Sequence, residues 1–567
     1  MAGVRLRLLS IFAALLVVAG CGADPAPRPS ASAAGTPTPT LSGGPAAKAA
    51  TLAASLSDED LVGQVLMPYA YGASATDVSA GSAAGNRKLA GVDTPAEMIA
   101  KYRLGGLILV GFSADDPTSK NQTTTNVDSV EQVRGLTTGL QDAAAKLPAG
   151  AAPMLIGTDQ EYGVVTRVKT GVTGLPSAMA FGAAGNPQLT ESAWRAAGAE
   201  LAALGINVDF APVADVLGSG GSSVIGSRSY GSDTAKVSAQ VAGAVRGLQA
   251  GGVAATLKHF PGHGHTTGDS HDSLPKLTQS RAGLDAADLP PFTAGIGAGA
   301  KLVMSGHLDV RAIDPGMPAT FSHKMLTDVL RGQLGFKGVV VTDGMNMAPA
   351  RRWQPGEAAV RAVNAGNDLL LMPDNLPLAY NGLLSALRTG ELSKDRLVEA
   401  ATRVLTLKFE LALAAVPQMS TVGSADHQRD VAKAAAAAVT QLRGACGGPL
   451  VRGPVTVTAA GGRTTTKGWL VDALRATGAE VVDSGGAVIH LVGYGDKRSD
   501  LRKGAAVTVA MDTPYLLADA DSPVLLATYS SSRLSMVALA DVLAGKAPAD
   551  GRSPVAVRGL PRTSCGG

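Results

Sequence analysis

The chain has 567 residues, which is too long for one compact core and indicates at least two domains. Hydrophobic residues make up 46% of the sequence and charged residues 17%, proportions that are typical of a globular protein with well-buried elements. The formal net charge is only +3, and the sequence has no stripe rich in lysine and arginine, which argues against a nucleic-acid partner.

Residues 1–20 predict an export signal. Arg5 and Arg7 precede an apolar run, residues 8–18, that is too short to span a membrane comfortably. Small residues then lead into Cys21, a pattern that resembles a bacterial lipobox, in which the cysteine is acylated and the preceding segment is removed. We therefore expect an exported protein that a lipid anchors in the cell membrane, facing outward. An ordinary secretory signal is the alternative.

Composition and periodicity divide the remainder into three parts. Residues 21–50 are rich in Pro, Ala, Ser and Thr and show no apolar periodicity, which predicts a disordered tether. Residues 51–415 are predicted to form the larger domain, and residues 425–567 a smaller one.

In the larger domain, short apolar runs alternate with stretches long enough for crossover helices, such as 191–204 and 234–250. This alternation indicates a parallel sheet, and about eight such units over this length fit a (β/α)8 barrel of the TIM type. A doubly wound open sheet has the same periodicity. The expected strands are 62–67, 106–110, 154–158, 206–210, 254–259, 302–305, 339–342 and 368–372.

Polar residues distinguish the two folds. Each of five residues lies at or just after the C-terminal end of an apolar run: Asp159, Asp209, His259, His307 and Asp343. In a barrel these ends converge on one mouth, whereas in an open sheet they spread along an edge. If these polar residues form one site, the sequence favours a barrel over an open sheet, because only a barrel brings the ends of so many strands together. The predicted fold class is α/β, an N-terminal barrel followed by a smaller C-terminal α/β sandwich.

The C-terminal domain shows no catalytic constellation. A helix over 426–442 is expected to lead into it, with strands at 455–457, 488–492, 507–511 and 524–527 and helices at 467–477 and 531–543. Besides Cys21, the chain has only Cys446 and Cys565, which bracket this domain. In an exported protein such a pair is more often bonded than free, so a disulfide is possible, with two reduced thiols as the alternative.

Four of the eight histidines lie close together in a Gly-rich stretch: His259, His263, His265 and His271. Zinc binding needs further ligands, and the stretch has no Cys, HExxH motif or nearby Glu. A structural role, in which the histidines hydrogen-bond in a strand-to-loop corner, fits His263. The catalytic interpretation assigns proton transfer to His271 and its orientation to Asp269, because imidazole titrates near neutrality.

Asp343 follows the β-branched run 339–342, and the small Gly344 beside it permits close approach of a ligand. Its carboxylate is a candidate for a nucleophile that captures a cationic centre. Capping of a helix is the alternative role for an Asp at the end of a strand. The presence of the Asp269–His271 pair on a neighbouring unit favours catalysis.

Over residues 56–410 the sequence resembles glycoside hydrolase family 3, specifically its N-acetyl-β-glucosaminidase branch. The stretch from Lys258 to Gly264, with the Asp-Ser-His at 269–271, is that branch's most specific mark. The resemblance implies that the Asp269–His271 pair is the acid/base, where most retaining glycosidases use a second carboxyl group. Asp343 and Met347 match the family's nucleophile motif, which implies a covalent glycosyl-Asp intermediate.

Sugar-binding roles follow from the same resemblance. The residues that it implicates are Asp159, Arg167, Arg228, Lys258 and His259, and charged groups suit the task because they form the stronger hydrogen bonds to hydroxyls. Two positions depart from the family pattern. Tyr162 replaces a usual Gly, and Ser227 stands where an Asp is common; we expect both changes at the rim of the pocket, where they bear on fine specificity.

The resemblance implies a retaining exo-β-N-acetylglucosaminidase without a metal or organic cofactor, acting on muropeptides or chitooligosaccharides. Whether water or phosphate is the acceptor stays open, and a monomer is favoured. Three alternatives remain: a β-glucosidase or β-xylosidase of the same family, a glycan-binding lipoprotein without activity, and a metal-dependent hydrolase. The presence of Asp343, Asp269 and His271 argues against the first two.

Overall fold

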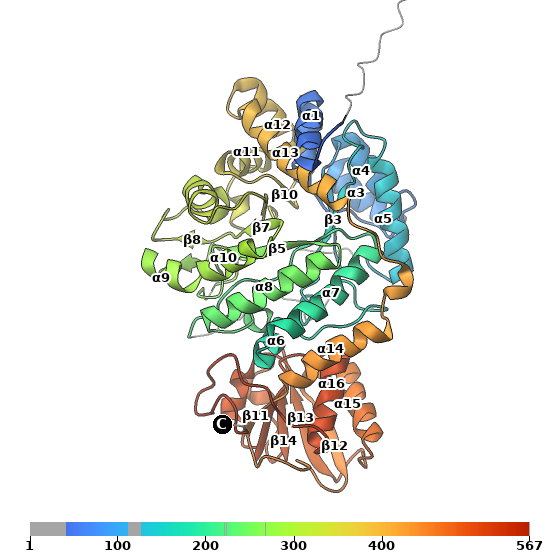
Figure 1. Ribbon diagram of the computed structural model, residues 1–567, viewed down its shortest axis with the longest axis vertical. Helices are drawn as coiled ribbons and strands as arrows, with labels where there is room; N and C mark the ends of the chain where they lie inside the picture. Colours follow the sequence, from blue (N-terminus) through green and yellow to red (C-terminus); the bar gives the residue numbers. More distant parts are fainter. Residues whose placement is uncertain (1–40, 112–125, 220–221, 223, 267, 566–567) are drawn as a thin grey trace, which may run out of the picture. The chain divides into compact units, whose positions relative to one another are not determined.

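The computed structural model describes residues 41–567 except 112–125, 220–221, 223, 267 and 566–567 (Figure 1). Residues Leu41–Gly567 form one compact unit. The predicted signal peptide, Cys21 and most of the predicted tether lie outside the described residues. Within the described part, no helix is long and apolar enough to cross a bilayer.

The end of the predicted tether is helical. Helix α1 (Pro45–Ser55) begins inside the segment predicted to be disordered, and Ala49 and Leu52 on it are buried. This helix packs against α13 (Lys394–Leu411) on the outside of the barrel. The prediction of disorder up to residue 50 is therefore wrong for residues 45–50, because α13 covers the apolar face of an Ala-rich helix.

Eight parallel strands form the N-terminal barrel. Six are hydrogen-bonded in the order β2-β3-β4-β5-β7-β9, and β1 pairs with β10. Single bridges close the ring: Tyr69, after β1, pairs with Ile108 of β2, and Val341 of β9 pairs with Leu369, just before β10. The strands are β1 (Leu66–Met67), β2 (Gly106–Leu109), β3 (Leu155–Thr158), β4 (Val208–Asp209), β5 (Ala254–Phe260), β7 (Leu302–Ser305), β9 (Val339–Thr342) and β10 (Leu370–Leu371). The predicted barrel is confirmed.

Alternation along the strands explains why these runs are apolar throughout. Leu302 and Val339 belong to the cluster that fills the barrel, whereas their neighbours Val303 and Val340 pack against the surrounding helices. Strands buried on both faces carry apolar residues at every position. A short pair, β6 (Lys276–Leu277) and β8 (Asp309–Val310), lies in the loops that follow β5 and β7.

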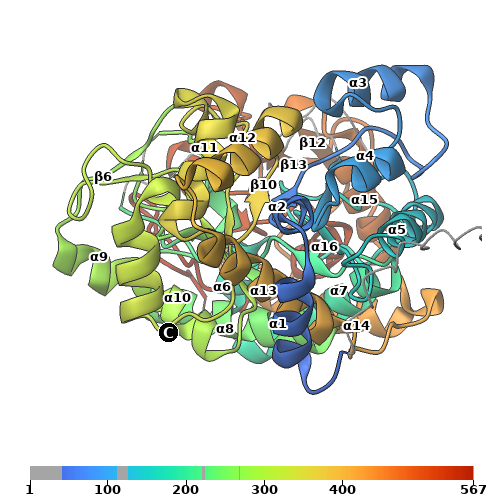
Figure 2. The ribbon, with the colours of Figure 1, turned by 90° about the horizontal axis from the view of Figure 1, so that it is seen from above.

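Helices surround the barrel (Figures 1 and 2). Many begin at a side-chain cap, as α8 does at Asp233, whose carboxylate accepts the Lys236 N–H. The helices of this domain are α2 (Asp58–Gln64), α3 (Ala80–Ala90), α4 (Pro95–Tyr102), α5 (Val130–Ala144), α6 (Ala178–Ala184), α7 (Pro187–Ala203), α8 (Thr234–Ala250), α9 (Arg281–Ala287), α10 (Leu289–Gly297), η4 (Lys324–Gln333), α11 (Pro355–Ala365) and α12 (Leu376–Thr389), besides α1 and α13.

Two predicted elements differ in the structure. The run 62–67 was expected to be a strand, but α2 takes its first half, because the Ser57 and Asp60 capping box starts a helix there. The helix expected over 426–442 ends early. Helix α14 (Ala425–Ala438) stops and β11 (Thr440–Arg443) follows, since the C-terminal sheet offers β15 as an antiparallel partner.

The C-terminal domain is the predicted α/β sandwich. Its sheet has the order β11-β15-β14-β13-β12, in which only β11 is antiparallel to its neighbour. Helix α16 packs against both α14 and α15 beside this sheet (Figure 1). The remaining elements are β12 (Val455–Ala459), β13 (Ala487–Val492), β14 (Val507–Ala510), β15 (Val524–Ala527), α15 (Thr464–Ala476) and α16 (Arg533–Leu543).

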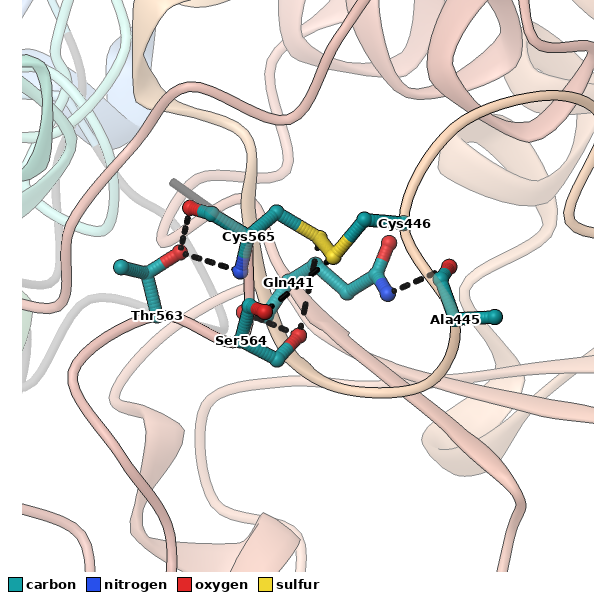
Figure 3. The surroundings of a disulfide bond; sticks show 6 residues. All are labelled: Gln441, Ala445, Cys446, Thr563, Ser564 and Cys565. Atoms are coloured by element: carbon teal, nitrogen blue, oxygen red, sulfur yellow. Dashed lines mark hydrogen bonds between the residues drawn. A yellow bond between two sulfur atoms is a disulfide. The ribbon is translucent and has the colours of Figure 1, made fainter. Parts of the chain in front are cut away.

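A disulfide fastens the end of the chain to the edge of this sheet (Figure 3). Cys446 and Cys565 have Cα atoms 5.5 Å apart and are separated by 119 positions in the sequence. The backbone N–H and the hydroxyl of Ser564 both donate to the Gln441 carbonyl of β11, at 2.7 and 3.1 Å. The last residues therefore extend the edge of the domain that begins with β11.

Replacing Cys446 by Ser should lower the free energy of unfolding by about 2–4 kcal/mol, because the bridge restricts a long loop of the unfolded chain. Urea denaturation of the variant and of the oxidised and reduced parent measures the effect. The reduced parent should match the variant. Equal stability of all three forms would show that the bridge contributes nothing.

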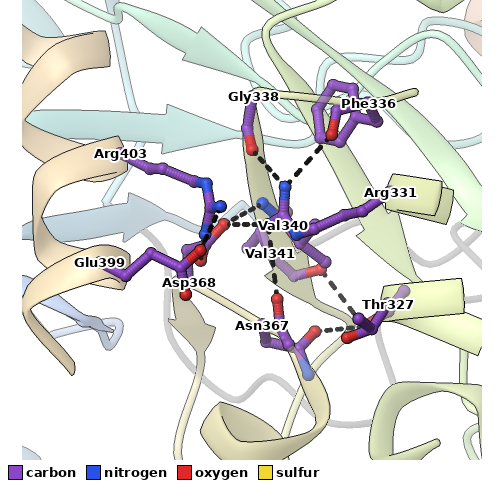
Figure 4. A network of polar contacts seen from close by, with 12 residues as sticks. Thr327, Arg331, Phe336, Gly338, Val340, Val341, Asn367, Asp368, Glu399 and Arg403 are labelled. Atoms are coloured by element: carbon purple, nitrogen blue, oxygen red, sulfur yellow. Dashed lines mark hydrogen bonds and ion pairs between the residues drawn. The ribbon is translucent and has the colours of Figure 1, made fainter. Parts of the chain in front are cut away.

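A buried charge network lies at the opposite end of the barrel from the strands' carboxyl ends (Figure 4). Asp368, just before β10, is fully buried and accepts from Arg331, Arg396 and Arg403 at 2.6, 3.0 and 3.2 Å. The same carboxylate accepts the Val340 N–H at 3.0 Å. It thus ties β9 to β10 and to two outer helices, η4 and α13.

Asp368→Asn should destabilise the protein by about 3–5 kcal/mol, because it removes the buried carboxylate that three arginines share and leaves only Glu399 to pair with Arg396 and Arg403. The amino-terminal face of such a barrel serves stability. Thermal denaturation should therefore show the loss, while kcat/KM of the folded variant stays unchanged. A variant with parent stability would mean that the arginines find other partners.

Candidate active site

A pocket of about 590 Å³, its open mouth included, lies at the carboxyl ends of the barrel strands. Seven of the residues predicted from the sequence line it, namely Asp159, Arg167, Arg228, Lys258, His259, His271 and Asp343. Asp269 lies directly behind His271, to which it is hydrogen-bonded. The structure therefore brings the predicted catalytic and sugar-binding residues together in one place.

Asp343 directly follows β9. Its N–H donates to the Ser305 carbonyl of β7 at 3.0 Å, and its Oδ1 accepts the Gly344 N–H at 2.8 Å. The next helical segment, η5 (Ala350–Arg352), has Pro349 at its N-cap, so Asp343 caps no helix. Burial raises the pKa of Asp343, but the nearby histidines and the Gly344 N–H outweigh burial and hold the pKa below its usual value. The side chain is therefore an ionised carboxylate at neutral pH.

His271 and Asp269 form a fixed pair on the loop between β5 and β6. One carboxylate oxygen of Asp269 accepts from both Nδ1 and the backbone N–H of His271, at 2.7 and 2.9 Å. A proton held on Nδ1 leaves Nε2 as the ring atom that exchanges a proton with a ligand. Because His271 lines the same pocket as Asp343, a bound molecule meets a carboxylate and an imidazole together.

His263 braces this loop. Its ring nitrogens meet Ser270 Oγ at 3.1 Å and Thr266 Oγ1 at 2.6 Å, and its N–H donates to Asp215 at 2.7 Å. Burial, together with the neighbouring His259, lowers the pKa of His263 to about 4, so the ring is neutral. This is the structural role that the sequence pattern indicated.

The other histidines of the stretch are bound to carboxylates. The Asp215 carboxylate is hydrogen-bonded to His259 Nδ1 at 2.8 Å, and the Asp288 carboxylate is hydrogen-bonded to His265 Nδ1 at 2.8 Å. In the part of the chain that the structure describes, no group of three or more His, Cys, Asp or Glu side chains is arranged to hold a metal ion.

Alternating charges line the side of the pocket formed by β3, β5 and the loop at Arg228. Lys258 Nζ lies 2.7 Å from Asp159 and 2.7 Å from Glu161, and Arg228 forms two bonds to Glu161 at 2.7 and 2.8 Å. Arg167 lies 3.6 Å from Asp159. Such a row presents donors and acceptors at fixed positions, which suits a ligand with several adjacent hydroxyls.

Glu161 holds this row together. Burial would raise its pKa, but Arg228 and Lys258 outweigh burial and lower it to about 2. The sequence motif contains this residue, yet the family resemblance gave it no role. It contacts the two cations that line the pocket without lining the pocket itself, which is why only the structure identifies it.

Glu161→Gln should raise KM at least about tenfold and destabilise the fold by about 3–5 kcal/mol, because two buried cations lose their counter-charge. The folded-state pKa of Glu161 is depressed from 4.5 to about 2, so its stabilisation is present above pH 4.5 and is lost as pH falls towards 2. The stability difference between parent and variant should therefore narrow in acid.

Denaturation curves at neutral pH and at about pH 3 measure this narrowing. Glu357→Gln is the matched control, because Glu357 pairs with Arg361 at 2.8 Å on the surface, where its side chain is 43% exposed. That change should cost less than about 1 kcal/mol. Equal losses in the two variants would contradict the assigned role of Glu161.

Asp215 is a further residue that the sequence did not reveal. It is fully buried after β4, and its carboxylate accepts the N–H groups of His259 and His263 at 3.1 and 2.7 Å besides the His259 ring. Burial raises its pKa, but the two histidines outweigh burial and lower it. The available signal was an Asp after the apolar run that contains β4.

The two departures from the family pattern lie outside the pocket. Tyr162 has φ 63°, a backbone conformation that glycine adopts easily, and its ring packs edge-on against Trp194. The Ser227 hydroxyl donates to the Asp512 carboxylate of the C-terminal domain. Neither residue lines the pocket, so neither disturbs the geometry around Asp343.

These features define a barrel protein with a pocket of charged side chains at the carboxyl face of its strands. Residues 59–407 match the glycosyl hydrolase family 3 N terminal domain. The chain therefore belongs to glycoside hydrolase family 3.

Among curated proteins, beta-hexosaminidase A of Pseudoalteromonas piscicida is 33% identical over 377 residues, which are 61% of this chain and 60% of that protein. The beta-N-acetylglucosaminidase/beta-glucosidase of Cellulomonas fimi is 33% identical over 371 residues, 62% of this chain and 65% of that protein. The matches thus span less than two thirds of the length of these relatives. The solved structure of a family 3 beta-N-acetylglucosaminidase from Paenibacillus sp. str. FPU-7 superposes with a TM-score of 0.76 at 30% identity, covering 90% of this chain and 100% of that one.

Proposed function

We propose that the protein is a retaining exo-β-N-acetylglucosaminidase. The observation that carries the proposal is the Asp269–His271 pair facing the same pocket as the ionised carboxylate of Asp343. Membership of glycoside hydrolase family 3 and the likeness to named β-hexosaminidases support this activity class. A pocket of this size, whose lining includes the apolar side chains of Met304, Leu371 and Met372, suits one terminal sugar.

In the first step, an Asp343 oxygen attacks the anomeric carbon as the glycosidic bond breaks. His271 Nε2 gives its proton to the departing oxygen, and the positive charge it carried is neutralised as the sugar becomes covalently bound. In the second step the neutral His271 takes a proton from water, whose oxygen attacks the same carbon and releases Asp343. Two inversions restore the original β configuration.

Asp159, Lys258 and Arg228 hold the sugar hydroxyls, and Glu161 keeps the two cations in place. Asp269 orients the His271 ring and stabilises its protonated form before bond cleavage. No step requires a metal ion, so activity should not respond to chelators.

The substrates proposed are fragments of cell-wall peptidoglycan, with chitooligosaccharides as the second choice. The basis is location, because the pattern that ends at Cys21 predicts a lipid-anchored protein facing the cell wall. Incorporation of labelled palmitate by the full chain, and its loss in Cys21→Ser, tests the anchor. A soluble, unlabelled parent protein would exclude it.

The decisive assay compares two chromogenic substrates on the chain without residues 1–21, an N-acetyl-β-glucosaminide and a β-glucoside. The acetamido sugar should be strongly preferred, and ¹H NMR should detect the β anomer as the first product. Equal use of both glycosides would favour a β-glucosidase, and initial release of the α anomer would exclude retention. Inactivity on both would favour a glycan-binding lipoprotein. Adding phosphate then shows whether it replaces water as the acceptor.

A further inference from the structure

His307 is a polar residue at the carboxyl end of a barrel strand that the proposed mechanism does not use. It follows β7 by two residues and is fully buried. Unlike Asp343, which follows the neighbouring strand β9, it does not line the sugar pocket. A sugar in the pocket therefore does not touch His307, and any role of this residue in the reaction must act through another residue.

The ring of His307 is held in one orientation. Its Nε2 lies 3.0 Å from the Gly344 carbonyl oxygen, and its Nδ1 lies 2.9 Å from Thr320 Oγ1. Thr320 Oγ1 in turn lies 3.0 Å from the Ser305 carbonyl oxygen at the end of β7. The ring is also stacked on Phe321, with 6.1 Å between the ring centroids. Because a carbonyl oxygen only accepts, Nε2 carries a proton and donates it to Gly344.

His307 is neutral at neutral pH. Burial is the main cause, since it lowers the pKa of the ring, and the nearby His271 and His259 lower this pKa further. Asp343 and the hydrogen bond to the Gly344 carbonyl raise the pKa, but burial outweighs them, and the pKa lies below its usual value. The ring therefore holds a single proton on Nε2 and supplies a fixed hydrogen-bond donor without a charge.

His307 donates to the residue that directly follows the proposed nucleophile. The N–H of this residue, Gly344, donates to Oδ1 of Asp343 at 2.8 Å. Among the described residues, the other carboxylate oxygen, Oδ2, has no hydrogen-bond partner. Because Asp343 lines the pocket, Oδ2 is the oxygen that is available to attack a bound sugar.

Gly344 belongs to a tight turn. Its carbonyl oxygen also accepts the Met347 N–H at 3.0 Å, and this bond closes the turn 344–347 on itself. The bond from His307 instead joins the closed turn to the segment that follows β7. Without that bond the turn would keep its internal hydrogen bond but would be free to tilt as a unit. Tilting would move the N–H that holds Oδ1 of Asp343.

We propose that His307 is a positioning residue for the nucleophile. By holding the turn 344–347 against β7, it keeps Oδ1 of Asp343 on the Gly344 N–H and leaves Oδ2 in place to attack the anomeric carbon. The inference rests on the proposed function, whose first step is that attack. The effect is geometric, because a displacement of about 1 Å in a reacting group can slow a reaction by roughly 10²-fold.

The test compares two substitutions of His307. Glutamine can place an amide N–H where Nε2 lies, whereas the shorter asparagine reaches only the position of Nδ1. His307→Asn should lower kcat/KM on a dinitrophenyl N-acetyl-β-glucosaminide by about 10- to 100-fold, and His307→Gln should recover most of this loss. The loss should be the same on a disaccharide, because His307 acts on the attack and not on the leaving group. Binding of N-acetylglucosamine, measured by calorimetry, should stay close to that of the parent.

His490 provides the matched control, because it is a buried histidine with the same two kinds of partner. In β13, its Nδ1 lies 2.9 Å from Thr458 Oγ1, and its Nε2 lies 2.8 Å from the Asp500 carbonyl oxygen. His490→Asn should lower the melting temperature about as much as His307→Asn does, but it should keep the parent kcat/KM. This comparison separates the loss of a buried hydrogen bond from the loss of the nucleophile's position.

Thr320→Val is a second variant, because it removes the hydroxyl on Nδ1 and preserves the shape of the side chain. It should show a smaller loss of kcat/KM with unchanged binding of N-acetylglucosamine, and it decides the question if His307→Asn does not fold. Parent kcat/KM in the variants that fold would overturn the inference. So would a loss that His307→Gln does not recover, a loss that appears as weaker binding of N-acetylglucosamine, or an equal loss of kcat/KM in His490→Asn.

The activity of the parent on the same glycoside is the separate measure of the proposed function. A parent that is inactive on every β-glycoside would refute that function and the role of His307 with it. An active parent whose His307 variants are equally active would refute the role of His307 alone.

Discussion

Asp343→Ala should lower kcat/KM on every β-glycoside by at least about 10⁴-fold, because a two-step displacement has no path without its nucleophile. The loss should be similar for good and poor leaving groups, since the missing bond is to the sugar itself. Steady-state kinetics on chromogenic and natural substrates measures it. Adding azide or formate should restore part of the turnover, and the azide product should have the α configuration because only one inversion takes place.

Asp374→Ala provides the comparison, since Asp374 is an exposed carboxylate shortly after β10 that does not line the sugar pocket. It should retain parent activity. If Asp343→Ala keeps more than about a tenth of the parent kcat/KM, the assignment of the nucleophile is wrong.

His271→Ala should lower kcat/KM by about 10²–10⁴-fold on a disaccharide, whose leaving oxygen needs a proton. On a dinitrophenyl glycoside, whose leaving group departs as an anion, the first step should be largely spared. The second step still lacks its base, so the covalent intermediate should accumulate and mass spectrometry should detect it on Asp343. Asp269→Asn should follow the same pattern with a smaller loss, because the ring remains but its orientation and charge support are weaker.

His323→Ala is the control for this series, because His323 is a surface histidine whose side chain is 64% exposed. It should behave like the parent. Equal losses of His271→Ala on both leaving groups would mean that His271 acts in binding and that another group transfers the proton.

The sequence predicted the barrel because its strands are continuous apolar runs separated by helical stretches. Patterns of this kind depend only on residues that are close together in the sequence. The wrong predictions fall where a local sequence pattern fits either a helix or a strand. Residues 62–64 are apolar enough for a strand, but the capping box at Ser57 decides for a helix. Residues 440–442 continue the predicted helix, but in the structure they belong to β11, because the distant β15 offers them a strand partner. A strand's pairing partner that is far away in the sequence leaves no pattern in the short stretch that it pairs with.

The candidate site divides in the same way. Asp343, Asp269 and His271 belong to short motifs, so they can be recognised from the sequence alone. Asp215 and Glu161 act through other side chains, across sequence separations of 44 and 67 positions in their hydrogen bonds to His259 and Arg228. Only the folded barrel, in which these strands lie side by side, brings such pairs together. A residue that supports another residue is therefore the kind that sequence patterns overlook.

The hydrogen bonds between Ser564 and Gln441 can form only late in the synthesis of the chain. A chain is made from its N-terminus, and β11 emerges from the ribosome long before the residues that fasten its edge. Until Cys565 arrives, the final sheet has an open border and a lone thiol at Cys446. A chain truncated before Ser564 would retain the whole catalytic pocket but would lack both the disulfide and the hydrogen bonds that cover the edge strand β11.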